Sequence, residues 1–278
     1  MTAELAPHSW NTGFVWRDHT GPFTTLTDEQ VAQFDRDGFV VIPDAYDADV
    51  LARLIEEIEP GVDLVRGLLE QLPGGRISVA GLDTQIVAPN LVGRSEYLRQ
   101  FCADELLVGI CRDLMGPDVR LYWEQAVYKQ PHGAEPVLWH QDNGYTFVEP
   151  QDYLTVWLAL TDATLDNGCI SVMPGHHRLG TLAHAETPIG FECAGDHDIA
   201  VDVPVRAGSL VIFSSLSPHA TRINTTDTVR KAYIIQYAHD GASGRQGDPS
   251  TGDGVAVPLD EPTRQFVVLR DGRRVEPA

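Results

Sequence analysis

The second half of the sequence is a succession of short runs of strand-forming residues, separated by turns rich in Gly, Pro or Asn. So many short strands within about 120 residues are typical of an antiparallel sheet that folds over on itself. They predict a double-sheet jelly roll, the double-stranded β-helix or cupin-like barrel, and a fold class of α+β, mainly β. The runs lie at residues 119–129, 153–160, 170–173, 199–205, 209–213, 221–223 and 231–238.

The first half of the sequence is predicted to supply helices that brace one sheet from outside. A capping box at 27–30 begins a helix that Gly38 ends, and a buried strand follows at 39–42. A second helix begins after Asp47, and we expect it to end at Pro60. A pair of helices then precedes the first strand of the jelly roll.

We interpret the chain as a single domain, because 278 residues with 43% apolar and 22% charged composition can bury one sizeable core. Residues 62–90 contain Pro and Gly clusters that favour irregular structure near the mouth of a pocket, where covering loops are found. The predicted parts are an N-terminal arm over 1–25, a helical bracing and lid region over 26–118, the jelly-roll core over 119–238, and a C-terminal loop or tail over 239–278 with an edge strand at 266–269.

The charge and the cysteines exclude several classes of protein. The chain has 40 acidic and 20 basic residues and a formal charge of −20, so no nucleic-acid partner is expected. No apolar stretch approaches the roughly 20 residues of a spanning helix, and no secretory signal is visible. We therefore expect a soluble, cytoplasmic protein without a membrane partner. The four cysteines form no CxxC pair, which argues against a structural zinc site. The sequence predicts no particular oligomeric state.

Two potential metal ligands stand two positions apart in the segment 139–145. If His140 and Asp142 lie on one strand, their side chains point to the same face and can reach one cation inside the barrel. A non-haem Fe(II) site needs a third ligand and three open positions. His219, which lies 79 positions after His140 with predicted strands in between, is the best candidate.

A candidate anion-binding arginine follows the third candidate ligand in the sequence. Arg230 comes eleven residues after His219 and opens a strand-forming run. A guanidinium that points into a barrel instead of into water needs an anionic partner, and a carboxylate matches its two-pronged geometry.

These segments together resemble the phytanoyl-CoA dioxygenase family of Fe(II)/2-oxoglutarate oxygenases. The resemblance covers roughly residues 26–238 and includes 166–169 and 173–177, two further motifs in the expected order. It implies that Fe(II) binds to His140, Asp142 and His219, and that O₂ and 2-oxoglutarate are co-substrates. It also implies that the distal carboxylate of 2-oxoglutarate meets Arg230 and Thr221, with further contacts from Gln125 and Trp157.

The resemblance implies oxidation of an unactivated C–H bond in a small molecule, with release of succinate and CO₂. Related halogenases have Gly or Ala where this chain has Asp142, so we expect hydroxylation, or else desaturation, epimerisation or cyclisation. The chain has no Lys/Arg cluster to receive the phosphates of CoA, so we expect a free small molecule such as a secondary metabolite or an amino-acid or fatty-acid derivative. Candidate substrate contacts are Trp139, Tyr145, Phe147 and Arg76. His176 and His177 are expected to shape a loop without binding iron.

Two other classes of protein remain open at this point. A catalytically silent cupin-like protein that binds a small molecule has no need for all four of His140, Asp142, His219 and Arg230. A zinc hydrolase with two His ligands and one carboxylate has the right ligand types. The hydrolase interpretation leaves Arg230 without a role and supplies no obvious general base.

Overall fold

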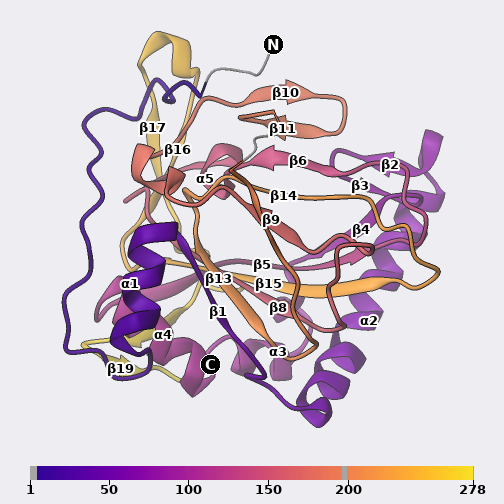
Figure 1. Cartoon of the computed structure of the whole chain (residues 1–278), viewed down its shortest axis with the longest axis horizontal. Helices are drawn as coiled ribbons and strands as arrows, with labels where there is room; N and C mark the ends of the chain where they lie inside the picture. The colour runs from indigo at the N-terminus through magenta and orange to yellow at the C-terminus, as the bar shows by residue number, and fades with distance from the viewer. Residues whose placement is uncertain (1–4, 196–198, 278) are drawn as a thin grey trace.

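Two antiparallel sheets lie one above the other and form the body of the molecule (Figure 1). The computed structural model describes residues 5–195 and 199–277. The large sheet has the strand order β1 (Phe39–Ile42), β13 (Leu210–Ser214), β8 (Leu154–Ala159), β15 (Arg230–His239), β5 (Val119–Lys129), β4 (Gln85–Pro89), β3 (Ala80–Gly81) and β2 (Arg76–Ile77), with β18 (Val267–Arg270) also pairing to β5 and β19 (Arg273–Arg274) to β18. The small sheet has the order β12 (Val201–Val203), β9 (Ile170–Val172), β14 (His219–Thr221) and β6 (Val137–His140). This is the predicted jelly roll, mainly β.

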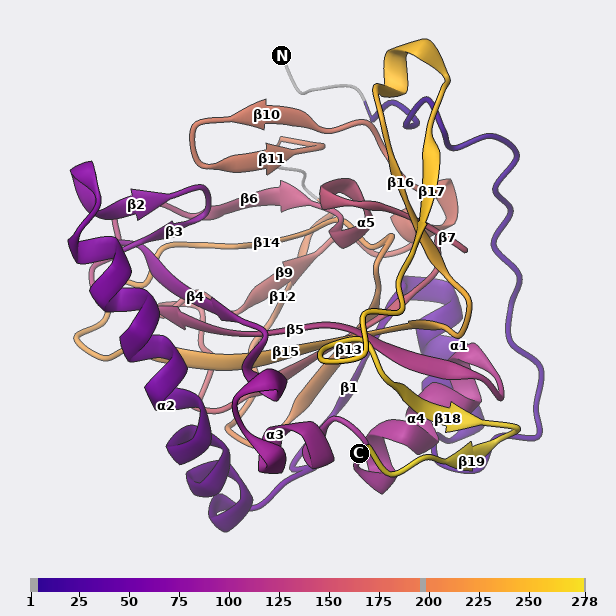
Figure 2. The same cartoon turned by 180° about the vertical axis from the view of Figure 1, so that it is seen from behind.

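Helices cover the outer face of the large sheet (Figure 2). They are α2 (Ala48–Glu70), α3 (Glu96–Phe101) and α4 (Glu105–Met115), while α1 (Asp28–Asp37) packs beside β1. The strands alternate between the two faces, as a pleated strand must. Along β15, Tyr233, Ile235 and Tyr237 belong to the core under the helices, whereas Ile234 and Gln236 line a cavity between the sheets. The large sheet therefore anchors the helices with one face and builds the site with the other.

Helix α2 does not end at Pro60, so that prediction is wrong. Proline removes one hydrogen-bond donor from a helix and usually stops or kinks it. Here the apolar face continues beyond it, since Val62 and Leu69 are buried. Gly61 lies so close to the Leu91 side chain that a Cβ at this position would stand 2.2 Å from it. Tertiary packing thus holds the helix together through the proline and as far as Glu70.

Two regions that we expected to be irregular contain strands. The stretch after α2 folds into η1 (Pro73–Gly75), β2, β3 and β4, and β4 pairs with β5 along its whole length. The expectation of a loop or tail over 239–278 is wrong, because β16 (Ser243–Gln246) pairs with both β7 (Phe147–Glu149) and β17 (Val255–Pro258). The edge strand predicted at 266–269 is confirmed as β18. Backbone pairing with distant strands, which local residue preferences do not reveal, orders both regions.

Several local predictions agree with the structure. Thr27 and Gln30 form the capping box of α1, and Gly38 ends that helix in the left-handed conformation. The strand expected at 221–223 lies slightly earlier, as β14, and so includes His219 itself. The described part of the N-terminal arm has no helix and contacts the body through a bridge from Pro7 to Leu182.

No helix of the described residues is long and apolar enough to cross a membrane. The remaining elements are η2 (Leu91–Gly93), α5 (Asp142–Tyr145), η3 (His176–Leu179), β10 (Ala185–Thr187), β11 (Gly190–Glu192) and η4 (Pro249–Thr251). We retain the single-domain interpretation as a proposal.

Candidate active site

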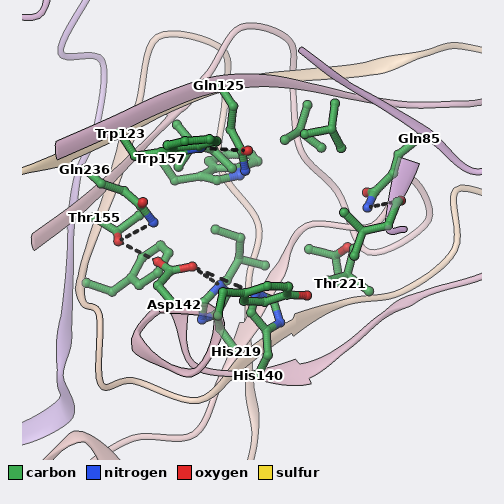
Figure 3. A pocket seen from close by; sticks show the side chains of 18 of the residues that line it. Gln85, Trp123, Gln125, His140, Asp142, Thr155, Trp157, His219, Thr221 and Gln236 are labelled. Atoms are coloured by element: carbon green, nitrogen blue, oxygen red, sulfur yellow. Dashed lines mark hydrogen bonds and ion pairs between the residues drawn. The ribbon is translucent and has the colours of Figure 1, made fainter. Parts of the chain in front are cut away.

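A cavity of about 390 Å³ lies between the two sheets (Figure 3). Strands β4, β5, β8 and β15 of the large sheet form one wall, and β6, β9 and β14 of the small sheet form the other. Its volume lies within the usual range for sites that enclose a small molecule. The predicted metal ligands and the predicted carboxylate-binding arginine all line this cavity.

His140, Asp142 and His219 converge on one point of the cavity wall. Their ligand atoms lie within 4.8 Å of one another. Oδ1 of Asp142 is 3.9 Å from Nε2 of His140 and 3.7 Å from Nε2 of His219. The two histidines are cross-strand partners on β6 and β14, which explains how residues distant in the sequence meet.

Asp142 reaches this point differently from our expectation. The strand β6 ends at His140, and Asp142 is the first residue of the short helix α5, so the two ligands do not share one strand face. The residue between them, Gln141, is fully buried. Its amide donates to the carbonyls of Gly180 and Leu216 and accepts from the backbone N–H of Leu182. These contacts hold the turn that swings the carboxylate back beside the imidazole.

The protonation of the two imidazoles suits metal binding. Nδ1 of His140 is 2.7 Å from the carbonyl oxygen of Leu138, and Nδ1 of His219 is 3.0 Å from that of Ser217. A carbonyl can only accept, so Nδ1 of each ring carries a proton and Nε2 is the nitrogen left to bind a metal in the cavity. Burial, together with the neighbouring His219, also lowers the pKa of His140 well below its usual value. Two imidazole nitrogens and one carboxylate oxygen fit the three-ligand face of a non-haem ferrous ion.

A threonine holds the second oxygen of the carboxylate. The Thr155 hydroxyl, which is completely buried on β8, donates to Oδ2 of Asp142 at 2.6 Å. Nε2 of Gln236 donates to that same hydroxyl oxygen at 3.4 Å. This arrangement leaves Oδ1 of Asp142 facing the two imidazoles (Figure 3). Nothing in the sequence around Thr155 had suggested this role.

Replacing Thr155 with valine should therefore weaken metal binding while leaving the three ligands in place. Partners of metal ligands typically contribute 10–100-fold to affinity, and we expect a loss of about that size for Co(II) binding followed by its visible absorption. Thr155→Ser keeps the hydroxyl and should bind Co(II) nearly as tightly as the unmodified protein. Equal Co(II) affinity in the valine and serine variants would contradict the proposed orientation of Asp142.

Arg230 is buried, and no carboxylate in the part of the chain that the structure describes forms an ion pair with it. Only 1% of the residue is exposed, and its Nε and Nη1 atoms have no hydrogen-bond partner. The guanidinium lies 5.3 Å from the ring centroid of Trp157. Burial lowers the pKa of Arg230 to about 10, so the side chain remains charged at neutral pH. A buried cation without a partner is costly, and a carboxylate in the cavity would satisfy the free N–H groups.

A second basic side chain, which the sequence analysis had missed, lies beside Arg230. Lys129 is 1% exposed, and its Nζ donates to the hydroxyl of Thr221 at 2.8 Å. Lys129 and Arg230 are cross-strand partners on β5 and β15. Burial and the nearby Arg230 lower the pKa of Lys129 to about 6. Residues two apart on a strand share a face, so its position four residues after Gln125 could have revealed it.

The other candidate residues divide into two groups. Gln125, Trp157, Thr221 and Tyr145 line the cavity, and the Tyr145 ring stands edge-on to His140 with 5.3 Å between centroids. Three candidates lie away from the lining. Trp139 packs in a core cluster with Met173 and Leu182, and Phe147 contacts His8 and Trp10. Arg76 forms a two-pronged ion pair with Glu135. Neighbours of His140 along β6 face the opposite side of the strand, which accounts for Trp139.

Comparison with known proteins agrees with this geometry. The phytanoyl-CoA dioxygenase (PhyH) family model matches residues 34–232, so the chain belongs to this family. The rat phytanoyl-CoA dioxygenase domain-containing protein 1 is 35% identical over 120 residues, which span 39% of this chain and 41% of that protein. Ectoine dioxygenase of Stutzerimonas stutzeri (strain A1501) is 24% identical over 86% of this chain and 88% of its own length.

Solved structures show the same fold. The non-heme alpha ketoglutarate dependent carbocyclase SnoK from nogalamycin biosynthesis superposes with a TM-score of 0.66 at 25% identity, covering 89% of this chain and 99% of that one. EctD from S. alaskensis, solved with 2-oxoglutarate and 5-hydroxyectoine, has a TM-score of 0.65 at 21% identity and covers 90% of this chain and 86% of that one. The fold of this chain is therefore shared with a protein that was crystallised with 2-oxoglutarate.

Proposed function

We propose that this protein is an Fe(II)/2-oxoglutarate-dependent dioxygenase that hydroxylates a C–H bond of a small molecule and releases succinate and CO₂. One observation carries the proposal. A donor set of two histidines and one carboxylate and a buried guanidinium with free N–H groups line the same cavity. The first suits a ferrous ion with open positions, and the second suits the distal carboxylate of a keto acid chelated there.

Each group of residues has a defined role in this proposal. His140, Asp142 and His219 hold the ion, and Thr155 orients Asp142. Arg230, with Thr221 and Lys129 beside it, receives the distal carboxylate. When bound, Fe(II), 2-oxoglutarate and O₂ together supply the oxidising chemistry. The protein's own task is to place one C–H bond of the substrate near the open metal positions and to exclude water from the cavity.

The two competing classes of protein, a silent small-molecule binder and a zinc hydrolase, explain fewer features of the cavity. A silent small-molecule binder gains nothing from a buried, unpaired guanidinium, whose burial is unfavourable without an anion. A zinc hydrolase would need a general base besides its ligands, and Asp142 is the only carboxylate among the described residues that line the cavity. Arg230 would also have no function in such an enzyme.

The proposal is tested by anaerobic addition of Fe(II) and 2-oxoglutarate to the purified protein. We expect a weak visible charge-transfer band, and, once O₂ is admitted with candidate small molecules, succinate release. Absence of the band would contradict the proposal, since neither a hydrolase nor a silent binder chelates a keto acid through iron. The product mass then separates the possible outcomes: hydroxylation adds one oxygen, desaturation or cyclisation removes two hydrogens, and epimerisation leaves the mass unchanged.

Lys129 should make keto-acid binding depend on pH. Its pKa of about 6 means that the amine is mostly neutral at higher pH. A bound dianion favours the ammonium form, so binding takes up a proton above that pKa. We expect the affinity of the Fe(II) protein for 2-oxoglutarate to fall as the pH rises from about 6 to about 8, by at most tenfold per pH unit.

Calorimetry in two buffers of different ionisation enthalpy measures both the affinity and the proton uptake. The variant Lys129→Met should show neither the pH dependence nor the proton uptake. An affinity of the unmodified protein that is constant over this range would show that Lys129 does not interact with the keto acid.

A further inference from the structure

We propose that the cavity takes as substrate an uncharged, mainly apolar molecule that carries at least one hydroxyl or N–H group, and that this group donates to Oε1 of Gln85. The inference rests on the proposed function, because the charges that it counts include the metal ion and the keto acid.

The charges around the cavity already balance one another. Among the described residues that line it, Asp142 is the only carboxylate and Arg230 the only arginine or lysine. Together with a ferrous ion and a dianionic keto acid, these two side chains sum to zero. Lys129 lies behind Thr221, outside the described cavity lining, and in the proposed function the ammonium that forms there is the counter-ion of the keto acid's distal carboxylate. A charged substrate group would therefore be buried with no counter-ion of its own, which is strongly unfavourable.

Arg76, which the sequence analysis named as a candidate substrate contact, provides no spare charge for a charged substrate group. Arg76 lies on β2 and binds both carboxylate oxygens of Glu135 through Nη1 and Nη2. Its charge is thus neutralised within the protein, and Arg76 is not part of the cavity lining.

The polar groups that remain are neutral amides, and neighbouring contacts determine which way each one points. Nε2 of Gln85 donates to the carbonyl of Val79 at 3.2 Å, so Oε1 is the free atom. Oε1 of Gln125 accepts from the Trp123 indole at 3.1 Å, so its NH₂ is left for a ligand. Swapping either amide would place two donors or two acceptors against each other. The cavity therefore presents a fixed acceptor and a fixed donor (Figure 3).

Gln85 is the residue of this set that most needs a ligand. It is only 7% exposed, and its Oε1 is buried without any hydrogen-bond partner. An unsatisfied buried acceptor is destabilising, and a donor from the ligand relieves it. A carboxylate or phosphonate oxygen cannot do so, because such groups only accept. Beside it the lining includes Val87 on β4 and its cross-strand partner Val127 on β5, which favours an apolar frame around the donor.

This inference distinguishes the chain from two of its relatives. Ectoine dioxygenase and the methylphosphonate hydroxylase of Gimesia maris, which is 29% identical over 77% of this chain, are named for charged compounds. We expect neither compound to bind well here, because the described cavity lining offers no unpaired charge to receive it.

Four ligands that share one frame test the inference: 4-ethylphenol, 4-ethylanisole, 4-ethylbenzoate and 4-ethylbenzylammonium. Each is titrated by ligand-observed NMR into the anaerobic protein loaded with Fe(II) and 2-oxoglutarate, after the charge-transfer band has been recorded. We expect 4-ethylphenol to bind at least tenfold more tightly than either charged ligand. Gln85→Met should weaken 4-ethylphenol binding about fivefold and leave 4-ethylanisole unchanged. Gln246→Met, at an exposed position on β16, serves as the matched control.

The outcomes distinguish failure of the substrate inference from failure of the proposed function. If the band forms but a charged ligand binds as tightly as 4-ethylphenol, or no ligand binds at millimolar concentration, the inference about the substrate is wrong while the proposed function stands. Equal 4-ethylphenol affinity in the Gln85→Met and control variants would overturn the role of Gln85. If the band itself does not form, both proposals fail, because the charge balance depends on the ion and the keto acid.

Discussion

Alanine in place of His219 is expected to abolish 2-oxoglutarate turnover and to reduce Fe(II) or Co(II) affinity by more than the roughly 10–100-fold that loss of an outer partner causes. His219 contributes one of three ligand atoms and is the cross-strand partner of His140. Without it only His140 and Asp142 would remain to hold the ion. Metal binding by calorimetry and succinate release measure the two effects.

His176→Ala is the matched control, because His176 lies on η3 and bonds through Nδ1 to the carbonyl of Pro174, away from the cavity lining. This variant should bind metal as the unmodified protein does. Circular dichroism and the melting temperature distinguish loss of a ligand from loss of the fold. Unchanged succinate release by a folded His219→Ala protein would refute the metal assignment.

Methionine in place of Arg230 should raise the dissociation constant for 2-oxoglutarate by about two orders of magnitude or more. Removing one partner of a buried, hydrogen-bonded charge pair costs about 2–5 kcal/mol, which corresponds to factors of roughly 30 to several thousand. Metal affinity in the absence of the keto acid should stay unchanged, because Arg230 contacts none of the three ligands through any recorded hydrogen bond or ion pair. Titration of the charge-transfer band measures this constant.

The same variant has a second, opposite effect that a merely structural arginine would not show. The guanidinium is buried without an anion, so replacing it with an apolar side chain removes an unpaired charge. We therefore expect the ligand-free Arg230→Met protein to melt at the same temperature as the unmodified protein or at a higher one. Arg230→Lys keeps the charge but loses the two-pronged geometry, so its keto-acid affinity should lie between the two. A lower melting temperature together with unchanged keto-acid affinity would make Arg230 a structural residue.

Much of the site could be predicted from the sequence because its key residues sit in strongly patterned segments. The alternating strands from 119 onward implied the jelly roll, and His140, Asp142, His219 and Arg230 were recognised by spacing and by family resemblance. The alternation of side chains along a strand also explains two residues whose positions the sequence analysis misjudged or missed. Trp139, next to His140, had to face away from the cavity, and Lys129, two and four residues after inward-facing positions on β5, had to face toward it.

Residue types and their periodicity alone determined the local elements of this protein: the capping box of α1, the strands of the jelly roll, and which side chains share a strand face. Only the tertiary structure decided that α2 runs on through Pro60, that β16 pairs with β7 and β17, and that Asp142 reaches the metal position from a helix. It also placed Thr155 on Asp142 and left Oε1 of Gln85 without a partner. The physical reason is range: capping and alternation act between residues a few positions apart, whereas these features arise from contacts between segments that meet only after the sheets have closed.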